Sequence, residues 1–145
     1  MEKLTDEERE KLERILGELS DHQATAEALR QHLSLLAASL SELSMTLEVI
    51  NTVKGLKPGT DILVPMGSDS FITAKLATTE KVITGLGADV AAERGSEDAL
   101  KVLEARRTEL AQALDRAREE LGKLGERMEA LRPEAERILE KAKQE

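Results

Sequence analysis

Apolar residues recur at alternating spacings of three and four in two long segments of the chain. They fall at Leu12, Ile15, Leu19, Ala26, Leu29, Leu33, Leu36, Leu40, Leu43, Leu47 and Ile50, and again at Leu100, Leu103, Leu110, Leu114, Ala117, Leu121, Leu124, Met128, Leu131, Ala135 and Ile138. His22 and Arg107 are the polar interruptions of these two ladders. Because the repeat averages about 3.5 residues, each segment is predicted to be a helix whose apolar seam faces a partner in a left-handed coiled coil.

The two ladders mirror each other, so the chain supplies its own partner helix. Pairing Ile50 with Leu100 puts Leu12 opposite Ile138, which predicts an antiparallel helical hairpin with seams of equal length. The first seam, at about 1.5 Å per residue, is expected to be roughly 57 Å long. We therefore predict a mainly α fold, a long antiparallel two-helix coiled coil in one domain, with its first helix in residues 1–54 and its second in residues 96–145.

The segment between the helices, residues 55–95, has the pattern of β-structure. Gly55 and the Pro58-Gly59 turn end the first helix, and Ser96 is predicted to cap the second. Four short β-type runs lie between them, at residues 62–66, 71–76, 81–86 and 90–94, joined by turn residues in two places. We predict two β-hairpins at one end of the helical hairpin, with the turn type left open by Asp69.

Two-stranded hairpins are marginally stable in water and expose their edges, so other chains are expected to cover them. We expect Ile62, Val64, Phe71, Val82 and Val90 to form one apolar face, which closure into a multi-subunit β-barrel would bury. Pro65 fits this arrangement if its missing N–H points off the ladder. The residues assigned to subunit assembly are Ile62, Val64, Phe71, Ile72, Leu76, Val82, Leu86 and Val90.

Composition narrows the functional classes. With one Phe, no Trp and no Tyr, the core must be the seam itself, and the absence of Cys removes disulfides and thiolate chemistry. The net charge of −8 argues against nucleic acid as a partner. No apolar run approaches the roughly 18 residues of a membrane helix, so we expect no membrane association and a cytoplasmic location.

No catalytic, metal-binding or cofactor-binding motif is recognised, and we expect no enzymatic activity and no cofactor. Gly85-Leu86-Gly87 lacks the third glycine and the following helix of a dinucleotide site, so it is interpreted as a hairpin turn. The spacing of His22 and His32 does not suit a metal. His22 and Arg107 either fix the register of the coiled coil or extend their polar ends to water.

The central segment closely resembles the α subunit of archaeal prefoldin, through residues 63–76 and 81–90, and residues 131–136 resemble the end of that family. The presence of two hairpins points to the α class, since β-type subunits carry one. The resemblance implies an α2β4 hexamer with prefoldin β subunits, in which a double β-barrel carries six coiled coils. It further implies an ATP-independent holdase that captures unfolded client proteins and delivers them to a group II chaperonin.

The resemblance implies that capture falls to the ends of the two helices farthest from the hairpins, here called the terminal ends, and deletion of residues 1–11 and 134–145 is expected to lower the protection of clients. Gly17 and Pro133 are predicted to weaken the terminal ends, so that the turns beyond open easily. The residues assigned to client binding are Leu4, Leu12, Ile15, Leu16, Met128, Ile138 and Leu139. The alternatives are ordinary coiled-coil core for those on the seam, and incidental exposure for Leu4, Leu16 and Leu139.

The sequence is also compatible with a second functional class, a structural coiled-coil protein. Such a protein would self-associate through its hairpins, as filament-forming relatives of prefoldin do, and would have the same helices and strands. The sequence does not identify natural clients, the affinity or contact residues of a chaperonin, the contribution of each coiled coil, or whether the chain forms homo-oligomers alone.

Overall fold

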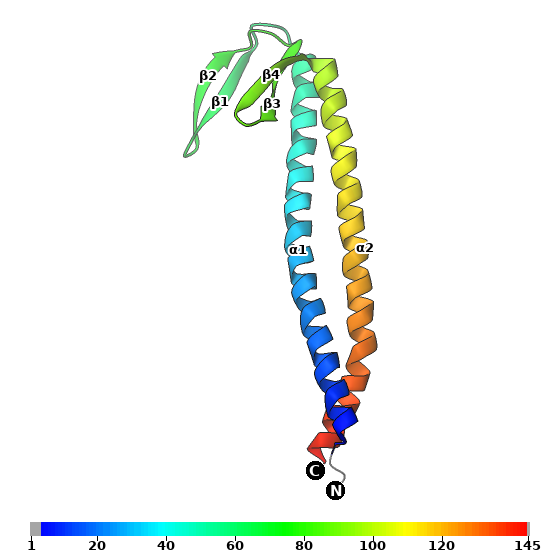
Figure 1. Cartoon of the computed structure of the whole chain (residues 1–145). Helices are drawn as coiled ribbons and strands as arrows, with labels where there is room; N and C mark the ends of the chain where they lie inside the picture. The colour runs from blue at the N-terminus through cyan, green and yellow to red at the C-terminus, as the bar shows by residue number, and fades with distance from the viewer. Residues whose placement is uncertain (1–3, 145) are drawn as a thin grey trace. The chain divides into compact units, whose positions relative to one another are not determined.

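The computed structural model describes residues 4–144, so predictions for residues 1–3 and for Glu145 lie outside it. Helix α1 (Asp6–Lys54) is followed by strands β1 (Asp61–Gly67), β2 (Ser70–Lys75), β3 (Lys81–Gly87) and β4 (Val90–Gly95), and then by helix α2 (Ser96–Lys143) (Figure 1). The mainly α class is confirmed, and each strand lies within one residue of its predicted bounds.

The chain divides into two compact units. The terminal unit contains Met1–Ala37 and Gln112–Glu145, and the hairpin unit contains Ala38–Ala111. In the hairpin unit, a core cluster of Leu47, Ile50, Ala99, Leu100 and Leu103 joins the end of α1 to the start of α2. The pairing of Ile50 with Leu100 that the mirrored ladders predict is therefore consistent with the packing of this cluster.

The ladders predict the buried residues of both helices. The buried apolar residues are Ile15, Ala26, Leu47, Ile50, Ala99, Leu100, Leu103, Leu114, Ala117, Leu124, Ala135 and Ile138, and all except Ala99 are ladder positions. Of the polar interruptions, Arg107 is exposed, as expected for a side chain that extends to water, and His22 is half-buried.

Helix α1 differs from the sequence expectation in how its apolar residues are distributed. By length and composition it is long and apolar enough to cross a membrane, with an 18-residue window of mean hydropathy 1.4, which corrects the prediction that no run approaches this length. The physical reason is that Leu35, Met45 and Val49 are exposed residues outside the seam, so that this part of α1 is apolar on more than one face. A single such helix is only a weak indication of a membrane span.

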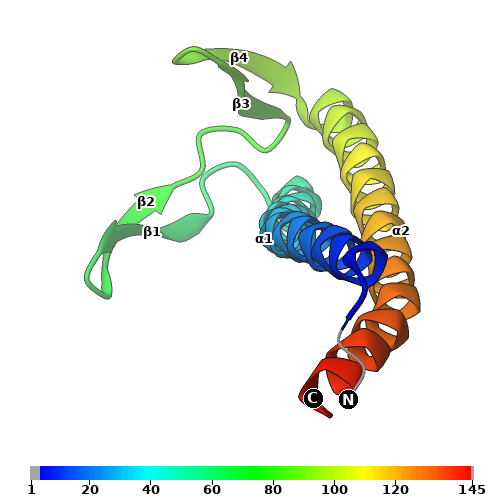
Figure 2. The same ribbon diagram turned by 60° about the horizontal axis from the view of Figure 1, so that its bottom comes forward.

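Each hairpin is a separate two-stranded antiparallel sheet, β1 with β2 and β3 with β4 (Figure 2). The two hairpins have the same register pattern, twenty residues apart in the sequence. The first has a bulge at Met66 and the second has one at Leu86, and a two-residue turn follows each bulge. Both turn residues have positive φ, 50° and 58° at Ser68 and Asp69, which is the type I′ turn that matches the twist of a hairpin. The turn type that Asp69 left open is thereby resolved.

The strand register corrects the predicted apolar face. Val64 lies opposite Ile72, whereas Phe71 lies opposite Pro65. Directly opposed residues share a face and successive residues alternate, so Phe71 is on the other face of the hairpin from Ile62 and Val64. The hairpin β1–β2 is therefore apolar on both faces rather than on one.

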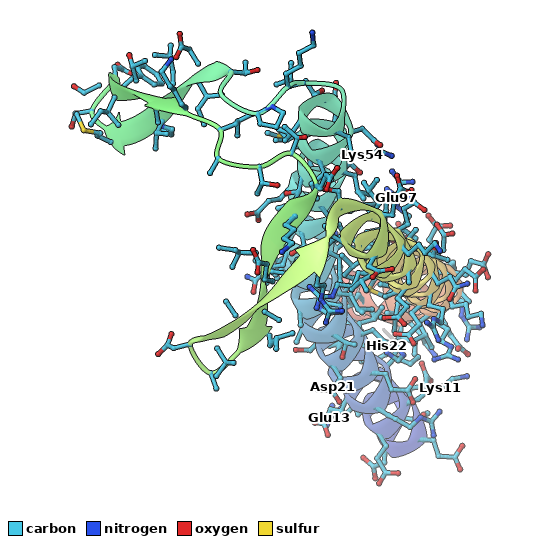
Figure 3. The ribbon with its side chains drawn as sticks, turned by 90° about the horizontal axis from the view of Figure 1, so that it is seen from above. Lys11, Glu13, Asp21, His22, Lys54 and Glu97 are labelled. Carbon is cyan, nitrogen blue, oxygen red and sulfur yellow. The ribbon has the colours of Figure 1, made fainter. Side chains whose placement is uncertain are left out.

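The start of α2 also differs in detail from the prediction. The Ser96 hydroxyl donates a hydrogen bond of 3.1 Å to the carbonyl of Thr79, and the Ser96 N–H donates to the carbonyl of Glu80 at 2.7 Å. Ser96 thus joins the helix to the β2–β3 connection. Nearby, Lys54 and Glu97 form an ion pair between the end of α1 and the start of α2 (Figure 3), and the hydrogen bond from Lys54 lowers the pKa of Glu97.

Candidate functional site: the terminal helix ends and the hairpin faces

The N-terminal end of α1 is closed by a capping box that was not predicted from the sequence. The N–H of Glu8 donates to Thr5 Oγ1 at 3.1 Å, and Thr5 Oγ1 donates to Glu8 Oε1 at 3.2 Å. A Thr followed three residues later by Glu is the sequence signature of a capping box. Here the Thr5 hydroxyl satisfies one amide that the helix start leaves unpaired, that of Glu8, and the Glu8 carboxylate accepts from this hydroxyl. This signal precedes Leu12, the first apolar position of the ladder.

Two ion pairs join this end of α1 to the last turns of α2. Lys141 Nζ lies 2.9 Å from Glu8 Oε1, and Lys11 is paired with Glu134. The hydrogen bond from Lys141 lowers the pKa of Glu8, and the hydrogen bond from Lys11 lowers the pKa of Glu134. Both carboxylates are accessible to water, so each pair is expected to respond to ionic strength.

The seven residues assigned to client binding fall into three groups. Ile15 and Ile138 are 2% and 3% exposed and belong to the seam, which is the core alternative left open by the sequence. Leu4, Leu12 and Met128 are half-buried. Leu16 and Leu139 are 44% and 40% exposed. Among the seven assigned residues, these two are therefore the exposed apolar side chains, and they lie next to a closed seam.

The terminal ends are closed in this structure, and that they open easily stays a prediction. Pro133 lies inside α2, and α2 continues through it to Lys143. The ion pairs and the burial of Ile15 and Ile138 hold the two helices together beyond the proline. Gly17 has nothing within 4 Å of the position that a Cβ would take, so packing does not require a glycine there.

The eight residues assigned to assembly differ in what they contact. Val82 packs against the core cluster of the hairpin unit, so it also supports the fold of the single chain. Ile62 and Leu76 are half-buried. Val64, Phe71, Ile72, Leu86 and Val90 are exposed, each by between 38% and 56% of its surface. Exposed apolar side chains in this number on short hairpins are typical of a surface that another chain covers.

An apolar groove of about 520 Å³ lies between β3 and the helices of the hairpin unit, and it was not predicted from the sequence. Met45 and Val49 of α1 form one wall, and Val82, Ile83 and Gly85 form the other. The sequence signal for this groove is the pair Met45 and Val49. Each follows a seam residue, Leu43 or Leu47, by two positions, which places the pair on the opposite side of the helix from the seam.

Among the described residues, no group of three or more His, Cys, Asp or Glu could hold a metal ion.

Comparisons with known proteins agree with this architecture. The prefoldin subunit family model matches residues 22–141. The chain belongs to the prefoldin family. A prefoldin subunit alpha of Methanopyrus kandleri is 35% identical over 112 residues, which cover 77% of this chain and 71% of that protein. One of Methanosphaera stadtmanae is 33% identical over 133 residues, covering 92% and 95%.

A solved structure supports the same conclusion about prefoldin architecture. The cryo-EM structure of filamentous PFD from Methanocaldococcus jannaschii is 27% identical in sequence with a TM-score of 0.70, and the match covers 81% of this chain and 98% of that one. The predicted resemblance to the α subunit of archaeal prefoldin is thus confirmed. The family is one of chaperone subunits that form multi-subunit complexes with other prefoldin subunits.

Proposed function

We propose that this chain is a subunit of an ATP-independent hexameric holdase, in which two copies assemble with four β-type prefoldin subunits through the hairpins. The support for assembly is the set of apolar side chains on both faces of β1–β2, with Phe71 and Val64 on opposite faces. A ribbon that is apolar on two sides needs cover on both, and a closed barrel within a multi-subunit body provides it. The complex would act in the cytoplasm.

Client capture is assigned to the terminal ends, and the observation that carries this proposal is the exposure of Leu16 and Leu139 beside the seam residues Ile15 and Ile138. An unfolded protein exposes apolar side chains in no fixed arrangement, so its receptor needs adaptable apolar surface rather than a shaped pocket. Leu4, Leu12 and Met128 would add to this surface, and Ile15 and Ile138 would join it when the helix ends separate. The held client would then pass to a group II chaperonin.

The holdase activity is tested by light scattering. A chemically unfolded protein is diluted, without ATP, into buffer that contains the chain assembled with a β-type prefoldin subunit. The expected result is suppressed aggregation at near-stoichiometric amounts of the complex. Unchanged aggregation in the presence of a well-formed complex would reject the holdase.

A filament or scaffold is the second candidate, and the observation that favours it is the filamentous state named for the structural neighbour. Self-association through the hairpins would cover the same apolar faces without a β-type partner. Sizing the chain alone and with the partner separates the two functions. Long homopolymers that ignore the partner would favour the scaffold, and a discrete mixed complex would favour the holdase.

A further inference from the structure

The terminal ends of α1 and α2 contain a set of contacts that the proposed function does not yet use. Lys141 pairs with Glu8, and Lys11 pairs with Glu134. Ala135 and Ile138 lie between these pairs along α2, and Ile15 lies one turn beyond Lys11 on α1; they are buried, at 4%, 3% and 2% exposure. The charged side chains therefore lie at the solvent boundary of the apolar surface that a client would need.

The segment of α2 that makes both ion pairs starts directly after a weak point. Pro133 has no N–H, so the helical hydrogen bond to the carbonyl of Glu129 is missing, and an interior proline weakens a helix. Glu134 follows it immediately, and Lys141 lies two turns further on. The helix itself holds this segment less firmly than the rest of α2, which leaves the contacts with α1 to fix its position.

The ion pair at Glu8 is also part of the helix cap. Glu8 Oε1 accepts hydrogen bonds from both Lys141 Nζ and Thr5 Oγ1. One carboxylate oxygen therefore takes part both in the first turn of α1 and in the contact with α2.

We propose that the pairs Lys141–Glu8 and Lys11–Glu134 form a salt-sensitive clasp that holds the terminal ends closed over Ile15, Ala135 and Ile138 and so regulates client access. This inference rests on the proposed capture of clients at the terminal ends. Exposed ion pairs are individually weak, so the clasp shifts a population rather than locking a state. Loss of two such pairs is expected to raise the ratio of open to closed terminal ends about three- to tenfold.

The chain has no Cys, so a single introduced thiol reports opening without background. The variant Ala135→Cys places the thiol in the seam beside Glu134, and Ala117→Cys places one at 6% exposure elsewhere in the seam of the terminal unit. The rate of maleimide labelling is measured on the full chain assembled with a cysteine-free β-type subunit. Ionic strength is raised from about 0.02 M to about 0.5 M, which shortens the screening length severalfold.

The clasp predicts labelling about three- to tenfold faster in high salt for Ala135→Cys and an unchanged rate for Ala117→Cys. When Lys11→Glu is added to Ala135→Cys, the new carboxylate repels that of Glu134, and labelling should be fast already in low salt. Further addition of Glu134→Lys recreates a pair of opposite charges and should restore the slow rate. Lys123→Glu makes the same change of charge at an exposed position of α2 in the terminal unit and should have no effect.

Client protection is measured on the same samples by light scattering, which separates the two claims. Faster labelling with stronger protection at low client concentration supports the clasp. Equal labelling rates for all variants and salts overturn the clasp while leaving the holdase intact. If labelling becomes faster while protection of the client is detectable but unchanged, the proposed regulation of access is wrong. If the parent complex gives no protection at any salt concentration, the holdase itself is rejected.

Discussion

Lys141 donates a hydrogen bond of 2.9 Å to Oε1 of Glu8, a residue 133 positions earlier in the chain. The contact lies in the terminal ends, where the sequence predicted, from Gly17 and Pro133, that the last turns open easily. Polar side chains continue the pairing of the two helices beyond the last buried apolar residues. The terminal ends are consequently closed by contacts that depend on charge.

The first prediction concerns pH. The pKa values of Glu8 and Glu134 are lowered in the folded chain, so their contribution to stability is present above the ordinary value of 4.5 and is lost as pH falls through the folded pKa. The variant Glu8→Gln/Glu134→Gln should therefore have a lower thermal midpoint than the parent near pH 6, and this difference should shrink below pH 4.5. A matched control, Glu10→Gln/Glu140→Gln, changes exposed carboxylates of the same helices. A difference that is constant with pH, or equal in the control, would contradict the assignment.

The second prediction concerns the two apolar faces of β1–β2. Since Phe71 and Val64 are on opposite faces, Phe71→Ser and Val64→Ser should each weaken assembly with a β-type subunit. Burial of such a side chain contributes about 1.5–3 kcal/mol, which corresponds to roughly 10- to 160-fold in the dissociation constant. Sedimentation over a range of concentrations measures this, with Thr73→Ser as the control on the Phe71 face. Full assembly of either variant would show that its face is left uncovered.

The third prediction concerns backbone strain in the second hairpin. Ala88 has a φ of 50°, a left-handed conformation that costs a non-glycine residue about 1 kcal/mol or more. Ala88→Gly should stabilise the chain against chemical unfolding by about 1 kcal/mol. The same substitution at Ala92, which pairs with Thr84 in the regular part of the strands, should destabilise it by about 0.5–1 kcal/mol. Destabilisation of similar size by both would show that the turn is not strained.

The fourth prediction concerns glycines inside α2. A Cβ added at Gly122 or Gly125 would meet nothing within 4 Å. Gly122→Ala and Gly125→Ala should therefore each raise the free energy of unfolding by about 0.5–1 kcal/mol, because alanine has the higher helix propensity. Gly87, with a φ of 93°, provides the contrast, since Gly87→Ala should destabilise the hairpin. A change of the same sign in the free energy of unfolding for the helical and the turn substitutions would contradict this interpretation.

The sequence predicted the helices and strands well because each carries a local and repetitive signal. The 3.5-residue ladder predicted Ile15, Ile50 and Ile138 as seam residues, and Gly55 and Ser96 marked the helix boundaries. The error over Phe71 has a specific cause. A bulge at Met66 and a two-residue turn set the register of the strands, and neither is determined by counting apolar residues.

The candidate site was harder to predict, because its contacts join residues far apart in the chain. The pairing of Lys141 with Glu8 depends on the register between two helices, and many other Lys and Glu residues have the same local surroundings. The groove beside Met45 depends on where β3 lies against α1, which no local pattern specifies. The Thr5 and Glu8 capping motif, by contrast, carried a recognisable local signal that went unpredicted.

The central claim is that the terminal ends capture unfolded proteins, and one comparison tests it most directly. The double variant Leu16→Ser/Leu139→Ser removes the two exposed apolar side chains of these ends, whereas Leu35→Ser removes one that is 69% exposed elsewhere on α1. Each variant is assembled with a β-type subunit, and suppression of client aggregation is followed by light scattering without ATP. We predict markedly weaker protection by the double variant and unchanged protection by Leu35→Ser. Equal protection by the double variant and the parent complex would contradict capture at the terminal ends.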